Sequence, residues 1–165
     1  MCKIYILGSV GSGKTTLARK LSEDLDIVHY ELDNIVWKYN LNGDIRRTEE
    51  EIEVLFNEIL EKDSWIIENV GRSYFDRGYE EADTIIYLKL SRLVLYKRVI
   101  LRWIKQNLKI EKASYKSDLK MLRQMLLWVD KEINDCKLKK LQLYMDKVTI
   151  LDEKSVKTYK YEKKV

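Results

Sequence analysis

Eight residues near the start of the chain match the phosphate-binding pattern G-x-x-x-x-G-K-[ST], namely Gly8, Ser9, Val10, Gly11, Ser12, Gly13, Lys14 and Thr15. Glycines allow a tight turn whose backbone N–H groups point at anionic oxygens, and the positive end of a following helix strengthens this attraction. The pattern predicts a nucleotide site for ATP and Mg²⁺. Lys14 is expected at the β/γ-phosphates, Thr15 at the metal and Thr16 near the α-phosphate.

Acidic residues follow two apolar runs that predict strands. Asp33 comes after the run 27–32, and Glu68 ends the run Trp-Ile-Ile-Glu. Ligands of open α/β sheets lie beyond the carboxyl ends of the strands, so both carboxylates are expected beside the phosphates. Asp33 is predicted to orient an acceptor hydroxyl or to bind the metal through water, with a helix cap or loop carboxylate as the alternative. Glu68 is predicted either near Mg²⁺, through water, or in a structural role.

Three further residues are candidates for contact with the acceptor. Trp37 lies four residues after Asp33 and either forms a wall of the acceptor pocket or packs in the core. Arg72 and Arg77 lie in the segment 71–78, which reads as a polar loop after Glu68. We expect these two arginines to hold the acceptor.

Basic residues form a row on a predicted helix. Arg98 and Arg102 are four residues apart, and Lys105 and Lys109 extend the same row. Such a row is usually a solvated face, but phosphoryl transfer needs positioned cations and a closing lid that excludes water. We therefore predict that Arg98 and Arg102 are catalytic and that a small lid lies around 102–118.

The spacing of apolar residues predicts alternating strands and helices. Strands are expected at 3–7, 27–32, 65–67, 84–90 and 148–151, and helices at 15–25, 48–60, 91–107 and 117–140. Thr48 and Glu51 have the spacing of a capping box, and 40–44 reads as a turn. This alternation predicts an α/β fold, a parallel sheet with helices on both faces in three layers.

Composition limits the classes of protein that fit. The chain has 165 residues and 45% hydrophobic residues, contains no proline and shows no linker, which predicts a single domain over 1–165 with a basic tail at 154–165. No apolar stretch approaches the roughly 20 residues that span a bilayer, so we expect a cytoplasmic protein without a membrane partner. The net charge of +4 is mild and does not by itself indicate DNA binding. Cys2 and Cys136 form no zinc or disulfide pattern, and His29 reads as a packed or edge imidazole.

Several stretches together resemble a known family: GSVGSGKTTLARKLSEDL, YELDNIVWK, WIIEN, EADTIIYLKLSR and YKRVILR. They are similar to the adenylate-kinase-related P-loop proteins known as DNA topology modulation proteins of the FlaR type, over roughly 3–151. The resemblance implies a nucleoside-monophosphate-kinase-like fold with a five-stranded parallel sheet of order 2-3-1-4-5. It also implies an ATP site at the glycine-rich loop, an arginine-bearing lid, a small acceptor between Asp33 and that lid, and an adenine contact from 152–156.

The chain departs from the family pattern at two places. After the third strand, relatives usually have Asp-Gly-Asn-Tyr, and this chain has Glu68-Asn69-Val70-Gly71. After the fourth strand, the usual Asp and Pro are replaced by Lys89 and Ser91. These differences leave open a nucleotide-binding protein that has lost transfer activity.

The leading hypothesis is an adenylate-kinase-like P-loop kinase that moves the γ-phosphoryl group of ATP to a nucleotide, nucleoside or small hydroxylated metabolite. Lys14, Asp33, Arg98 and Arg102 would carry the transfer, and Thr15 would hold Mg²⁺. The alternative is an ATP-switched DNA-binding regulator of topology without small-molecule kinase activity, supported by the basic row on the predicted helices and by the basic tail. ATP and a small acceptor are the expected partners; nucleic acid is not favoured.

Overall fold

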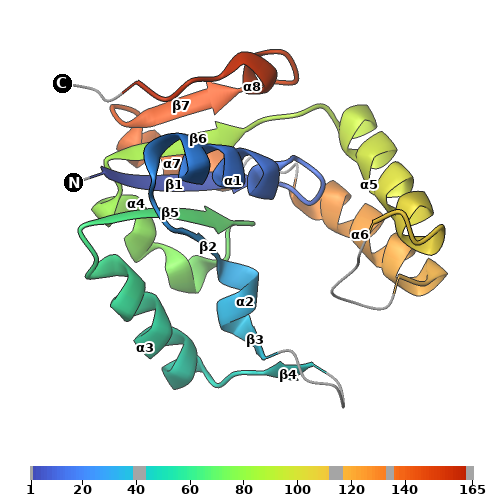
Figure 1. The fold of residues 1–165 in the computed structure, drawn as a ribbon, viewed down its shortest axis with the longest axis horizontal. Helices are drawn as coiled ribbons and strands as arrows, with labels where there is room; N and C mark the ends of the chain where they lie inside the picture. The colour runs from blue at the N-terminus through green and yellow to red at the C-terminus, as the bar shows by residue number, and fades with distance from the viewer. Residues whose placement is uncertain (1, 39–43, 112–116, 133–135, 163–165) are drawn as a thin grey trace.

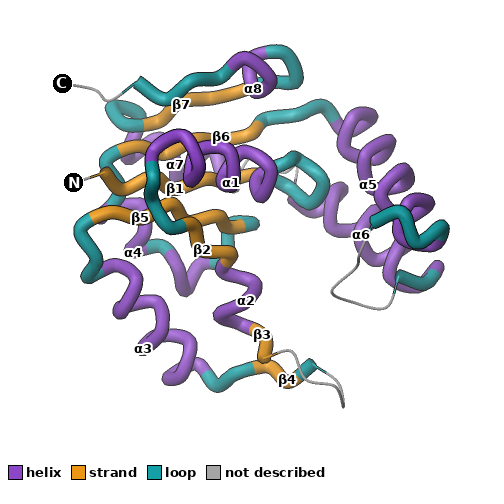
Figure 2. Tube along the Cα trace, in the orientation of Figure 1, coloured by secondary structure: helices purple, strands orange, loops and turns teal. Residues whose placement is uncertain are grey.

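Five strands form one parallel sheet at the centre of the protein (Figures 1 and 2). The computed structural model describes residues 2–38, 44–111, 117–132 and 136–162. The strands lie in the order β2-β5-β1-β6-β7, and every neighbouring pair is parallel. Counted along the chain, these five strands have the order 2-3-1-4-5. The predicted sheet and its order are confirmed.

The elements of the chain alternate as the sequence predicts. The sheet strands are β1 (Cys2–Gly8), β2 (His29–Glu31), β5 (Ser64–Asn69), β6 (Thr84–Leu88) and β7 (Val148–Leu151). A separate antiparallel pair comprises β3 (Trp37–Lys38) and β4 (Ile45–Arg46). The α-helices are α1 (Lys14–Leu25), α2 (Leu32–Val36), α3 (Glu49–Leu60), α4 (Arg77–Glu81), α5 (Arg92–Asn107), α6 (Leu119–Glu132), α7 (Cys136–Leu141) and α8 (Ser155–Thr158). Short 3-10 turns are η1 (Ser73–Phe75) and η2 (Gln142–Tyr144).

The central strand β1 is buried on both faces. Its side chains alternate, so that Ile4 and Ile6 enter one hydrophobic cluster while Tyr5 and Leu7 enter the other. All four are at most 1% exposed. This is why β1 reads as a continuous apolar run, as strands covered on both sides do.

Helices cover both faces of the sheet, giving the three predicted layers. Leu17 and Leu21 of α1 and Val129 of α6 belong to the cluster with Ile4 and Ile6. The opposite cluster takes its helical side chains from α2, α3, α4 and α7. Val156, Tyr159 and Tyr161 of the tail also pack against the α1 side, whereas Lys154, Lys157 and Lys160 are exposed.

The start of α3 confirms the capping box. The hydroxyl of Thr48 accepts a hydrogen bond from the backbone N–H of Glu51 at 3.2 Å, and the Glu51 carboxylate accepts one from the N–H of Thr48 at 2.9 Å. Both bonds satisfy donors that a helix start otherwise leaves unpaired, and they fix where α3 begins.

Two predictions of local structure need correction. The strand predicted over 27–32 is present but shorter, since β2 covers His29–Glu31, and Asp33 lies in the first turn of the helix α2 that follows it. Leu32, Ile35 and Val36 are buried at helical spacing, so tertiary packing favours a short helix there. The polar loop predicted over 71–78 is instead η1 followed by the start of α4.

Some predictions fall partly outside the described residues. The structure does not describe residues 40–43 of the predicted turn or residues 112–116 of the predicted lid. Residues 133–135, within the predicted helix 117–140, also lie outside the described ranges. On either side of that last gap the chain forms α6 and α7. Among the residues that the structure describes, none belongs to a helix of the length and apolar character needed to cross a membrane.

Candidate functional site

The glycine-rich loop connects β1 to α1 and turns sharply at two glycines. Gly11 and Gly13 have φ values of +76° and +94°, a left-handed conformation that favours glycine. The N–H of Ser12 donates to the carbonyl of Ser9 at 3.1 Å and closes the turn. Because the loop leads directly into the N-terminus of α1, its backbone N–H groups and the helix dipole provide an anion site, as the sequence predicts.

Lys14 and Thr15 are the first two residues of α1, and their side chains have different hydrogen-bond partners. The ammonium of Lys14 donates to the carbonyl of Ser9 at 3.0 Å, so it lies over the loop. The hydroxyl of Thr15 donates to the Glu68 carboxylate at 2.7 Å. Thr16, the next residue, is exposed on α1. The Lys14 ammonium therefore lies against the loop, and the Thr15 hydroxyl faces a carboxylate.

Glu68 lies at the carboxyl end of β5 and is only 6% exposed. Burial raises the pKa of its carboxyl group, the hydrogen bond from Thr15 and the charge of Lys14 oppose the rise, and the carboxylates of Glu31 and Asp33 add to it. In the sheet, Glu31 is the register partner of Glu68. Acidic groups from the ends of β2 and β5 and from α2 thus gather next to the phosphate loop.

Magnesium chemistry fits this set of donors. Mg²⁺ prefers oxygen ligands, and in phosphate sites it usually takes one or two carboxylates together with substrate phosphates. Thr15 and Glu68 supply a hydroxyl and a carboxylate in direct contact. Over the described ranges there is no group of three or more His, Cys, Asp or Glu residues that could hold a metal ion. A metal ion at Thr15 and Glu68 would therefore need phosphate oxygens as further ligands.

Arg98, the first residue of the predicted basic row, contacts the phosphate loop. Its guanidinium donates to the carbonyl of Ser12 at 2.7 Å. The same helix, α5, packs on the loop, since a Cβ atom on Gly11 would lie 3.0 Å from the Cγ2 atom of Val99. Arg102, one turn later, is paired with Glu111, with Nε and Oε1 3.4 Å apart.

Of the two arginines predicted to hold an acceptor, only Arg72 contacts Asp33. A guanidinium N–H of Arg72 donates to the carboxylate of Asp33, which links the segment after β5 to α2. Arg77 instead donates to the side chain of Asn57 on α3 at 2.6 Å. Trp37 is partly buried against the cluster that contains α2 and α3. The structure therefore brings Asp33 and Arg72 together and places Arg77 elsewhere.

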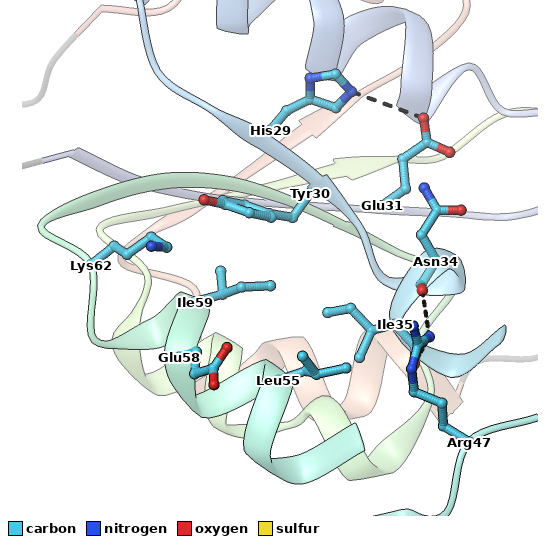
Figure 3. A pocket seen from close by; sticks show the side chains of 10 residues that line it. All are labelled: His29, Tyr30, Glu31, Asn34, Ile35, Arg47, Leu55, Glu58, Ile59 and Lys62. Carbon is cyan, nitrogen blue, oxygen red and sulfur yellow. Dashed lines mark hydrogen bonds and ion pairs between the residues drawn. The ribbon is translucent and has the colours of Figure 1, made fainter. Parts of the chain in front are cut away.

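A pocket of about 470 Å³ lies between β2, α2 and α3 (Figure 3), and its lining includes Asn34 next to Asp33 but not Asp33, Trp37 or Arg72 themselves. Tyr30 and Ile59 form part of its apolar lining, and Lys62 and Arg47 lie at opposite ends. Glu31, the last residue of β2, also lines it. The sequence analysis missed this pocket because its residues come from segments without a common pattern.

Comparisons with known proteins give a family and a fold. A family model described as an AAA domain matches residues 4–116, more than half of the chain. A shikimate kinase from Blochmanniella floridana is 28% identical over 102 residues, which cover 53% of this chain and 54% of that protein. The chain thus spans about half the length of this curated relative.

Solved structures of kinases share the fold at low sequence identity. A gluconokinase from Sinorhizobium meliloti 1021 has a TM-score of 0.55 and 17% identity, with 95% of this chain and 86% of that one covered. A shikimate kinase from Bacteroides thetaiotaomicron has a TM-score of 0.53 and 15% identity, with coverage of 90% and 84%. A sugar kinase from Janibacter sp. HTCC2649 has a TM-score of 0.50 and 17% identity, with coverage of 92% and 85%. These likenesses show the architecture and leave the activity to be argued from the site.

Proposed function

Because the chain belongs to the AAA domain family, we propose that it is a P-loop kinase that transfers the γ-phosphoryl group of ATP to a hydroxyl group of a small acceptor. One observation carries the proposal. Glu68 of β5 accepts a hydrogen bond from Thr15 of the phosphate loop, and the segment directly after β5 carries Arg72, which donates to Asp33 of the acceptor side. Nucleotide and acceptor groups therefore share one site, which phosphoryl transfer requires.

On the nucleotide side, the loop 8–15 binds the phosphates through backbone N–H groups. Lys14 neutralises the β/γ-phosphates, and Arg98, which lies on the loop through Ser12, adds positive charge where negative charge spreads during transfer. Thr15 and Glu68 would hold Mg²⁺, which would offset the negative charge of the phosphates. Arg102 belongs to the proposed lid, around 102–118, that excludes water on closing.

On the acceptor side, Asp33 and Arg72 have complementary tasks. The Asp33 carboxylate accepts the hydrogen bond of the acceptor hydroxyl and takes its proton as the oxygen attacks phosphorus. The new P–O bond forms while the bond to the β-phosphate oxygen breaks, and ADP leaves. Arg72, released from Asp33, pairs with an anionic group of the acceptor. Trp37 and the neighbouring pocket complete the acceptor contacts.

The acceptor class follows from these two side chains. A carboxylate that orients a hydroxyl and an arginine that pairs with an anion select a small hydroxylated molecule with a negative group. The names of the relatives, shikimate kinase and gluconokinase, support such an acceptor. Within the broader class of nucleotides, nucleosides and hydroxylated metabolites, we place hydroxylated acids first.

An ADP-release screen tests the proposal. Purified protein with ATP and Mg²⁺ is given shikimate, gluconate, neutral sugars, nucleosides and nucleoside monophosphates in separate reactions, with Lys14→Ala as the matched control. We expect at least one hydroxylated acid to raise ADP release well above the rate of the Lys14→Ala variant. If no acceptor does so at saturating ATP, the kinase proposal fails.

The resemblance to the topology modulation proteins raises a second candidate function, DNA binding. The DNA-binding alternative predicts binding to duplex DNA that weakens steeply with salt and survives Lys14→Ala. Filter binding of wild type and variant across a salt series separates the two functions.

A further inference from the structure

The segment that carries Arg72 is held at both of its ends by one buried hydroxyl group. Asn69 ends β5 and Phe75 ends η1, and they are 2% and 0% exposed. The Tyr5 hydroxyl on β1 accepts a hydrogen bond from the Asn69 side-chain amide at 2.8 Å and donates one to the Phe75 carbonyl at 3.1 Å. Tyr5 therefore links the central strand to both ends of 69–75.

The backbone of Arg72 is tied to the same two residues. Its N–H donates to the side-chain oxygen of Asn69 at 3.3 Å, and its carbonyl accepts from the N–H of Phe75 at 3.2 Å. Gly71 has a φ of +98°, which lets the chain reverse immediately before Arg72. The position of the Arg72 backbone thus depends on Asn69 and Phe75, which in turn bond to Tyr5.

The ring of Tyr5 is fixed by packing that does not involve its hydroxyl. Gly78 of α4 lies flat against it, since a Cβ atom there would be 2.4 Å from the ring. The rings of Tyr79 and Trp65 have centroids 5.1 Å and 6.4 Å away. Burial raises the pKa of the Tyr5 hydroxyl group well above its ordinary value, so it stays protonated and both donates and accepts. Loss of the hydroxyl alone would therefore leave the ring in place.

We propose that Tyr5 and Asn69 are positioning residues, which set the place of the Arg72 guanidinium opposite Asp33 and so determine how tightly the acceptor binds. Neither residue touches the acceptor. The consequence for acceptor binding rests on the proposed function, whereas the ordering of Arg72 does not.

The direct test measures the order of the Arg72 side chain in the protein without an acceptor. In Tyr5→Phe, the buried Asn69 amide loses its acceptor and the Phe75 carbonyl loses its donor, so 69–75 is released. We expect the ¹⁵N order parameter of the Arg72 Nε–H group, assigned by its loss in Arg72→Lys, to fall from a rigid value to below about 0.6. Asn69→Ala removes the same connection from the other side and should give the same fall.

The matched control is Tyr79→Phe, which removes a hydroxyl from the neighbouring ring of the same core. That hydroxyl has no part in the bonds to Asn69, Arg72 and Phe75 described above, so the Arg72 order parameter should stay at its wild-type value. An unchanged order parameter in both Tyr5→Phe and Asn69→Ala would overturn the proposal. So would an equal fall in the control, because the effect would then be a general loosening of the core.

Kinetics provide a second readout that general destabilisation would not produce. With the acceptor that releases most ADP in the screen above, Tyr5→Phe should raise the KM for acceptor about tenfold and leave the KM for ATP within about twofold. Equal rises in both KM values would contradict a positioning role. If the screen finds no acceptor, the proposed function fails, while the relaxation measurement still decides whether Tyr5 orders Arg72.

Discussion

The packing of α5 on the phosphate loop predicts a specific energetic coupling between Gly11 and Val99. A Cβ atom on Gly11 would lie 3.0 Å from the Cγ2 atom of Val99, which is itself 2% exposed. Gly11→Ala therefore has two costs. The left-handed φ of +76° costs an L-residue about 1–2 kcal/mol, and the crowding costs about 1–3 kcal/mol. The free energy of unfolding should fall by about 2–5 kcal/mol.

A double-mutant cycle separates the two costs. Val99→Ala removes the methyl group that the new Cβ atom meets, so the double variant should recover most of the crowding cost and keep only the backbone strain. We expect a coupling energy of about 1–2 kcal/mol in favour of the double variant. Urea unfolding of the wild type, both single variants and the double variant measures it.

Gly13 offers a control within the same loop. A Cβ atom there would have the Arg98 guanidinium as its neighbour at 3.5 Å, and Val99 is not within 4 Å. Gly13→Ala and Val99→Ala should therefore add to within about 0.5 kcal/mol. If Gly11 and Val99 also proved additive, α5 would not lie on the loop, and the placement of Arg98 at the phosphates would lose its basis.

Three further predictions concern the site itself. Lys14→Ala should abolish the rise in melting temperature that ATP with Mg²⁺ gives the wild type, because a ligand that binds only the folded state stabilises it; an unchanged rise would remove Lys14 from the site. Folding raises the pKa of the Glu68 carboxyl group, so the stability that this group contributes is lost as pH rises from its unfolded pKa through its folded pKa. Urea unfolding at a series of pH values should show this loss in the wild type and a flatter dependence on pH in Glu68→Gln. Identical pH dependence in the two proteins would refute the prediction. In the kinase assay, Arg72→Ala should raise the acceptor KM about 10- to 100-fold, whereas Arg77→Ala, which loses a bond to Asn57, should leave it within about twofold; similar effects of both would contradict the acceptor site.

The parts of the fold that the sequence predicts are those encoded locally. The phosphate loop needs glycines at set positions, a lysine and a threonine, and these occur together over 8–15. Thr48 and Glu51 likewise predict the start of α3 from a pattern only four residues long. The inner strands β1, β5 and β6 are recognisable because burial on both faces demands continuous apolar runs.

The parts that the sequence analysis missed depend on contacts between distant segments. Helix α2 has five residues, too few to be stable alone, and it exists because Leu32 and Val36 pack on the core. Asp33 and Arg72 are both identifiable as candidates, but 39 positions separate them, and their contact joins α2 to the segment after β5. No local pattern reports such a contact.

The most direct test of the central claim is ³¹P NMR of the complete reaction. Wild-type protein, ATP, Mg²⁺ and the best acceptor from the screen should give a new phosphate-ester signal that grows in step with ADP. Lys14→Ala should give neither signal. ATP breakdown to ADP and inorganic phosphate alone, or no turnover with any hydroxylated acceptor, would contradict the account.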